Sequence, residues 1–106
     1  MIYPKFTIYR ILHKDRNIQE IYYGSTTNFT RRRSQHKKNV NNKRKRLYHC
    51  KLYKFIRMFG GWDNFDMEIV EVYPCDNLIE GKAKEQYYID MYKPSLNSVN
   101  SSNLNI

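Results

Sequence analysis

The stretch Lys5–Gly24, KFTIYRILHKDRNIQEIYYG, decides the fold, because two β-rich runs in it are joined by a polar turn. In residues 5–13 apolar side chains occupy both odd and even positions, which point to opposite faces of a strand, so we expect a strand covered on both faces. Residues 18–24 predict a second strand, and residues 14–17 supply the turn. A symmetric turn would place Tyr9 opposite Tyr22, with Cβ atoms about 4.5 to 5.5 Å apart. Two such phenols could share one small ligand, or simply pack together.

Length and composition predict one small domain. The chain has 106 residues, enough for a single modest core, and we assign residues 1–98 to the domain and residues 99–106 to a flexible tail. No run of about 18 apolar residues is present and the first residues lack the apolar core of a secretory signal, so an intracellular protein without a membrane partner is expected. Cys50 and Cys75 stand alone and predict ordinary thiols. We expect a monomer or a weak dimer.

The charge of the chain is segregated along the sequence. The net charge is +9, and residues 21–62 hold twelve of the 19 basic residues without a single Asp or Glu. Residues 63–106 hold eight of the ten acids. Twelve uncompensated cations would repel one another, so a polyanion such as nucleic acid is the expected partner. A membrane surface fits less well, because residues 28–39 offer only Phe29 as an apolar anchor.

The rest of the chain predicts three helices and a third strand. Asn28 is a candidate N-cap for a helix that ends near Asn39, and residues 40–46, rich in Asn and basic side chains, predict a mobile loop. Apolar residues at helical spacing predict a second helix that stops at Gly60-Gly61; they are Leu52, Phe55, Ile56 and Phe59.

Residues 65–73 alternate as a strand does, and Pro74 ends it. Asn77 is a candidate N-cap for a last helix over residues 78–92, with Ile79, Ala83 and Tyr87 on one face. The predicted fold is therefore α+β: a small three-stranded antiparallel sheet flanked by helices, in the order β-β-α-α-β-α.

Several spaced motifs resemble those of the GIY-YIG nuclease superfamily, in particular the catalytic domain of GIY-YIG homing endonucleases. The resemblance covers residues 5 to 98, and it rests on Ile8-Tyr9, Tyr22-Tyr23-Gly24, Asn28, Arg31-Arg32, His36, Glu85 and Asn97. Thr7 stands where the family usually has Gly, so the close backbone approach that this Gly permits can be altered. Tyr23 replaces a small aliphatic residue, which we interpret as a packing variation.

The resemblance implies a role for several polar residues. Tyr9 would be the general base, which requires nearby cations to lower a phenol pKa that starts near 10. Tyr22 would orient the attacking water, or serve only as a core aromatic. Arg32 would grip the scissile phosphate. His36 lies one helical turn beyond Arg32 and would bond phosphate or assist proton transfer.

The remaining assignments concern the metal and the substrate. The resemblance implies that Glu85 holds one Mg²⁺ or Mn²⁺ ion, although Glu80 is a rival and an exposed helix charge is the plainer interpretation. Asn97 would contact a phosphate or brace the site. Substrate contacts are also expected at Gly24, Asn28, Arg31, Arg33 and, more loosely, His49. The implied function is a metal-dependent endonuclease acting on double-stranded DNA; the alternative is a non-catalytic basic domain that only binds nucleic acid.

Overall fold

The computed structural model describes residues 1–97 of the chain. Its elements are β1 (Thr7–His13), β2 (Ile21–Thr26), α1 (Phe29–Asn41), α2 (Lys51–Met58), a short 3-10 turn (Trp62–Asn64), β3 (Phe65–Val72) and α3 (Leu78–Tyr92). The predicted α+β class and element order are confirmed. Within this part of the chain no helix is long and apolar enough to cross a membrane. The expected tail lies outside the described residues.

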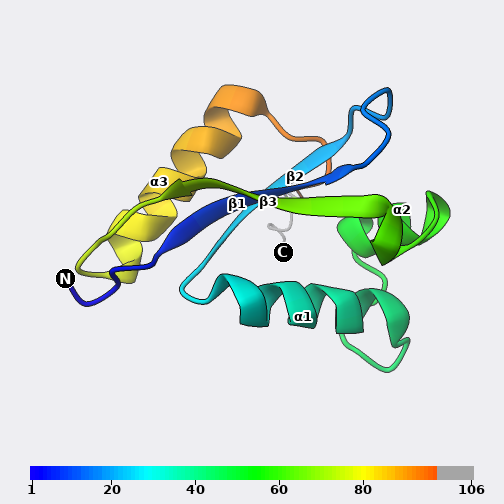
Figure 1. Ribbon diagram of the computed structural model, residues 1–106, viewed down its shortest axis with the longest axis horizontal. Helices are drawn as coiled ribbons and strands as arrows, with labels where there is room; N and C mark the ends of the chain where they lie inside the picture. Colours follow the sequence, from blue (N-terminus) through cyan, green and yellow to red (C-terminus); the bar gives the residue numbers. More distant parts are fainter. Residues whose placement is uncertain (98–106) are drawn as a thin grey trace.

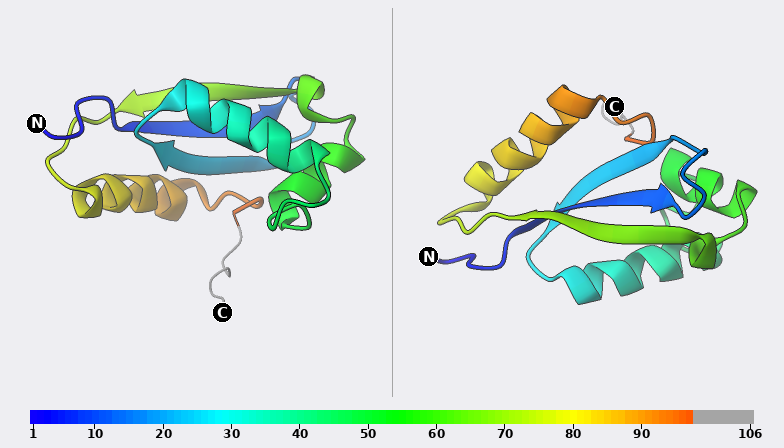
Figure 2. Two further views of the ribbon diagram at one scale, coloured as in Figure 1. Left: turned by 90° about the horizontal axis from the view of Figure 1, so that it is seen from below. Right: turned by 45° about the horizontal axis from the view of Figure 1, so that its top comes forward.

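The sheet is antiparallel, with the strand order β2-β1-β3. Figures 1 and 2 show α1 and α3 on opposite sides of it, and α2 near the end at which β3 begins. The central strand β1 is therefore covered on both faces, which explains its nearly continuous apolar sequence. On the α1 and α2 side the core includes Tyr9 and Ile11, and on the α3 side it includes Phe6 and Ile8.

The predicted register of the first two strands is wrong by two residues. Tyr9 pairs with Gly24, and Tyr22 pairs with Ile11. The connection is asymmetric, because Asp15 forms a turn with its backbone and side chain and the pairing begins only at Leu12 with Ile21. A shift of two preserves the face on which each side chain lies. Tyr9 and Tyr22 are thus diagonal neighbours, with ring centroids 6.3 Å apart.

The helix ends follow the predicted caps. The side chain of Asn28 accepts a hydrogen bond from the Arg31 N–H at 3.0 Å, and Asn77 caps α3 in the same way. At the end of α2, Gly60 has a φ of 103°, and the Gly61 N–H reaches back to the Ile56 carbonyl at 2.8 Å. This reach across the last turn is a Schellman closure, which favours Gly at its left-handed position.

One expectation about the helices is wrong. The helix α1 continues to Asn41, because Val40 is fully buried and anchors its last turn, so Val40 does not belong to a loop. The face of α3 that carries Ile79, Ala83 and Tyr87 is exposed. The helix packs on the sheet through its other side, where Gly81 lies so close to Phe6 that a Cβ atom would overlap the phenyl ring.

Candidate active site

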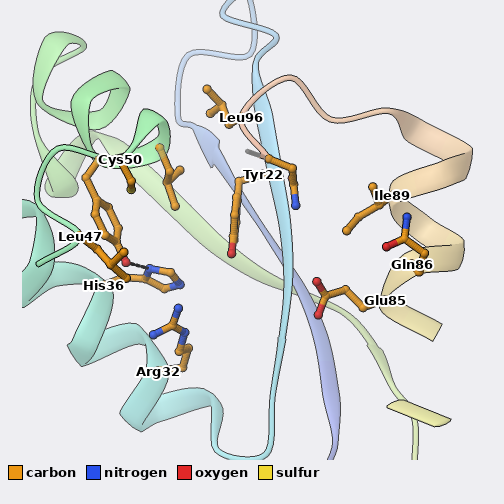
Figure 3. A pocket seen from close by; sticks show the side chains of 12 residues that line it. Tyr22, Arg32, His36, Leu47, Cys50, Glu85, Gln86, Ile89 and Leu96 are labelled. Carbon is orange, nitrogen blue, oxygen red and sulfur yellow. Dashed lines mark hydrogen bonds between the residues drawn. The ribbon is translucent and has the colours of Figure 1, made fainter. Parts of the chain in front are cut away.

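A cavity of about 490 Å³ lies beside the free edge of β2, between α1 and α2 on one side and α3 on the other. Figure 3 shows Arg32 and His36 on one side of this cavity, Glu85 across from them on α3, and Tyr22 between the two sides. Leu47, Cys50, Leu52 and Leu96 add an apolar portion to its lining. Residues distant in sequence therefore meet where the edge strand leaves room between two helices.

Tyr9 lies behind the cavity, in the core, and its residue is only 1% exposed. Its phenol rests against Gly24, where an added Cβ atom would lie 2.6 Å from Tyr9 Oη. The missing side chain of Gly24 permits a close approach, and the group that approaches is the phenol of Tyr9. Gly24 is thus needed to bring Tyr9 up to the site.

Burial raises the pKa of Tyr9 to about 12, although the nearby Arg32 guanidinium opposes this shift. The condition that nearby cations lower the pKa of Tyr9 below its usual value is therefore not met in the free protein. One guanidinium does not outweigh the loss of hydration around a phenolate in the core. Tyr9 holds its proton at neutral pH.

His36 lies on α1, and both of its ring nitrogens have protein partners. Nε2 is 2.7 Å from Tyr9 Oη, and Nδ1 is 2.7 Å from Tyr53 Oη. Burial, with a further contribution from Arg32, lowers the pKa of His36 to about 3. The imidazole is therefore neutral and is bonded to the tyrosines, so of the two roles considered for it the geometry favours proton transfer over phosphate binding.

Tyr22 and Arg32 present polar groups to the cavity itself. The Tyr22 hydroxyl points into it, between Arg32 and Glu85 (Figure 3), and among residues 1–97 it has no hydrogen-bond partner. Burial raises the pKa of Tyr22 well above its usual value, so this hydroxyl is protonated. One N–H group of Arg32 donates a hydrogen bond to Gln35 Oε1 at 3.2 Å. The guanidinium also interacts with the Tyr9 hydroxyl, and its remaining donors can bind an anion.

Glu85 faces the cavity from α3, and its side chain is 18% exposed. The Ser25 hydroxyl on β2 donates to Glu85 Oε1, and Lys82 Nζ lies 3.3 Å from the same oxygen. Lys82 Nζ also donates to Ser25 Oγ at 3.0 Å. Within the described residues no three His, Cys, Asp or Glu side chains converge. A metal held here would have one protein carboxylate, which fits a hard cation that keeps most of its waters.

Asn97 braces the edge of the sheet. Its Oδ1 accepts from the Tyr23 N–H at 2.9 Å, and its Nδ2 donates to the Tyr23 carbonyl at 2.8 Å. The neighbouring Leu96 N–H donates to the Ile21 carbonyl at 3.1 Å. The segment after α3 therefore forms hydrogen bonds with the edge of β2 that no strand pairs, next to the tyrosines. Of the roles considered for Asn97, bracing is the one its contacts support.

Besides Tyr9 and Gly24, four sequence candidates lie outside the cavity lining. Arg31, Arg33 and His49 are exposed, and Asn28 is engaged as the helix cap. Glu80 accepts a hydrogen bond from the Asp76 N–H at 2.9 Å and is exposed. The geometry therefore favours Glu85 over Glu80 as the carboxylate of the site.

Thr7 is buried in the strand, and its Oγ1 donates to the Lys5 carbonyl at 2.7 Å. Among residues 1–97 the only non-glycine residue with a positive φ is Lys93, so Thr7 adopts ordinary strand geometry. Thr7 does not line the cavity.

The sequence reasoning missed three polar residues around the site, Ser25, Lys82 and Tyr53. Tyr53 had a usable signal, because it precedes Ile56 by three positions and so shares the core-facing side of α2. Ser25 directly follows Gly24 and gave no such signal. Lys82 precedes Glu85 by three positions on the helix, and its charge alone did not distinguish it from the other lysines.

A phenol, a guanidinium and a carboxylate gathered at one cavity of a strongly basic domain are the groups that an enzyme hydrolysing phosphodiester bonds would use. The model of the GIY-YIG catalytic domain matches residues 5–100, and the chain belongs to this family. It is therefore a nuclease with a nucleic-acid substrate, and nucleases of this family typically depend on a divalent metal. No curated protein and no solved structure matches the chain.

Proposed function

We propose that the protein is a metal-dependent endonuclease of double-stranded DNA, in which Tyr9 is the general base, Arg32 grips the scissile phosphate and Glu85 holds the metal. The observation that carries the proposal is the arrangement around one cavity: Arg32 and Glu85 face each other across it, and Tyr22 points between them (Figure 3). Pure binding would need the cations and no opposed carboxylate.

Arg32 is the phosphate ligand of this site. Its planar fork can contact two oxygens of a phosphodiester and stabilise the charge that builds up as the water attacks. Arg31 and Arg33 point about 100° to either side along the helix, so they are left for neighbouring phosphates. A phosphate at Arg32 lies on the side of the cavity where the tyrosines are.

The two tyrosines handle the attacking water. The hydroxyl of Tyr22, free of protein partners in the described chain, orients the water by a hydrogen bond. Tyr9 takes its proton, which requires Tyr9 first to release its own. The Arg32 charge favours the phenolate, whereas Glu85 opposes it. Neutralisation of Glu85 would therefore make the phenolate easier to form.

The oxygen donors on α3 and β2 fit a single Mg²⁺ or Mn²⁺ ion. Glu85 would hold the ion, with the Ser25 hydroxyl fixing the orientation of the carboxylate. A bound divalent cation supplies positive charge that stabilises the phosphate and the leaving oxygen. Lys82 would have to move away from Glu85, because its ammonium group and a metal ion at the same carboxylate oxygen would repel each other.

The exposed cations of α1 and the segment that follows it would contact the duplex. Arg33, Lys37, Lys38 and Lys45 line shallow pockets along the outer face of α1. A helix of 13 residues is about 20 Å long, which suits contacts with several successive phosphates. One chain supplies one complete site, so we infer that a monomer or weak dimer cuts one strand at each encounter.

Nicking of supercoiled plasmid DNA in Mg²⁺ or Mn²⁺ tests the proposal. Tyr9→Phe and Arg32→Ala should lower the rate by at least about 10²-fold. Arg16→Ala removes one positive charge at the distant hairpin turn, where Arg16 pairs with Asp66, and should keep the rate. Cleavage that persists in both site variants would refute the residue assignments. Cutting of duplex RNA in preference to duplex DNA would refute the assigned substrate.

A further inference from the structure

A series of hydrogen bonds runs through the core behind the cavity. Tyr9 Oη lies 2.7 Å from His36 Nε2, and His36 Nδ1 lies 2.7 Å from Tyr53 Oη. Asn39 Nδ2 then donates to the Tyr53 oxygen at 3.2 Å. The ring of His36 stacks on Trp62, which holds it in this orientation. The function proposed above gives no task to Tyr53 or Asn39, and the inference that follows rests on that function.

The charge states of these groups limit where their protons can lie. His36 is neutral, so its ring carries one N–H. We assign protonated Tyr9 as the donor to Nε2, and this assignment places the ring proton on Nδ1. The Tyr53 oxygen then accepts from both Nδ1 and Asn39, and its own hydrogen is left to face the cavity that Tyr53 lines.

We propose that Tyr53 is a positioning residue that allows neutral His36 to exchange one tautomer for the other when Tyr9 loses its proton, and that Asn39 holds Tyr53 for this task. The O–H bond of Tyr9 breaks as Nε2–H forms, and Nδ1–H breaks as a new O–H forms on Tyr53. The former hydroxyl proton of Tyr53 passes to a water in the cavity. One proton leaves, and the phenolate of Tyr9 faces an N–H donor.

Other exits for this proton are less favourable. In the free protein Tyr9 is 1% exposed and does not line the cavity, so before substrate binds its proton has no direct route to bulk water. Transfer to His36 alone would create an imidazolium, which burial and the charge of Arg32 both disfavour. Of the other groups that face Tyr9, Tyr22 on β2 is itself a protonated phenol, and Glu85 on α3 is engaged by Ser25 and Lys82. Tyr53 is both a donor and an acceptor, so it satisfies either tautomer of the ring.

The first arm of the test measures the tautomer of His36 by nitrogen NMR of the protein labelled in its histidine rings. The wild type should carry the proton on Nδ1 at neutral pH, and Tyr53→Phe, which removes its acceptor, should move the population toward Nε2. A wild-type proton on Nε2, or a population that Tyr53→Phe leaves unchanged, overturns the proposal. This arm needs no DNA, so it stands even if the proposed nuclease mechanism fails.

The second arm measures cleavage of a DNA duplex in Mg²⁺. Tyr53→Phe should lower kcat at least tenfold while KM stays within twofold, because Tyr53 does not hold the substrate. Asn39→Ala keeps the phenol of Tyr53 and should give a smaller loss of kcat with the same KM. This variant replaces Tyr53→Phe in the test if Tyr53→Phe folds poorly. Tyr88→Phe is the matched control, since it deletes a hydroxyl that bonds Glu71 at 2.6 Å on the other side of the sheet. Unchanged kcat in Tyr53→Phe, or an equal loss in Tyr88→Phe, overturns the proposal.

Discussion

Replacement of Gly24 by Ala tests how the fold brings Tyr9 to the site. The new Cβ atom would lie 2.6 Å from Tyr9 Oη and 2.7 Å from Cζ, against the 3.4 Å at which ordinary contact begins. The phenol must therefore retreat by about 0.8 Å, which is enough to disrupt its 2.7 Å hydrogen bond to His36. A misplacement of about 1 Å at a reacting group costs about 10²-fold in rate.

The assay for Gly24→Ala combines single-turnover cleavage with urea unfolding. Overpacking of this kind should destabilise the fold by about 1 to 3 kcal/mol, so the rate is measured where both proteins remain folded. Gly81→Ala is the matched control, because its Cβ atom would overlap Phe6 in the core on the α3 side. It should lose similar stability and keep its rate. A Gly24→Ala enzyme that cuts at the wild-type rate would refute the role of this contact.

Three further predictions concern protons and the metal. Because the pKa of His36 is depressed to about 3, its contribution to stability is complete above about pH 6.5 and declines as the pH falls toward 3. Over this range the free energy of unfolding, measured by urea titration, should fall more steeply in the wild type than in His36→Gln, by about 1.4 kcal/mol per pH unit. Because Tyr9 must ionise from a raised pKa, the single-turnover rate should rise about tenfold per pH unit between pH 6 and 9, and a flat profile would contradict its role as the base. Lys82→Met removes the cation that pairs with Glu85, so Mn²⁺ binding followed by electron paramagnetic resonance should tighten, by up to about fivefold; weaker binding would show that Lys82 does not compete with the ion.

Local patterns were sufficient for the elements of this fold. Asn28 and Asn77 marked helix starts, and Gly60 marked a helix end, because caps act through hydrogen bonds between residues close in sequence. The register of the hairpin was not predictable in this way. It depends on how Asp15 shapes the turn, and an asymmetric connection displaces the pairing by two residues.

The site was predictable in its charged members and not in its hydrogen-bond partners. Arg32 and Glu85 were found through the resemblance, and the structure places them across one cavity. The pKa of Tyr9 could not be judged, because burial depends on the packing of α1 and α2 against the sheet. For the same reason Tyr53 was overlooked: its contact with His36 joins residues 17 positions apart on two different helices.

The central claim is that one cavity both grips a phosphate and uses the Glu85 carboxylate to cut the DNA. Binding and cleavage of the same labelled duplex, measured in parallel for the wild type and Glu85→Gln in Mg²⁺, test it most directly. We predict equal or tighter binding by Glu85→Gln, since a negative charge near the phosphate is removed, together with a loss of cleavage of at least about 10²-fold. Cleavage by Glu85→Gln at the wild-type rate, or equal cleavage by the wild type in the presence of a chelator, would contradict it.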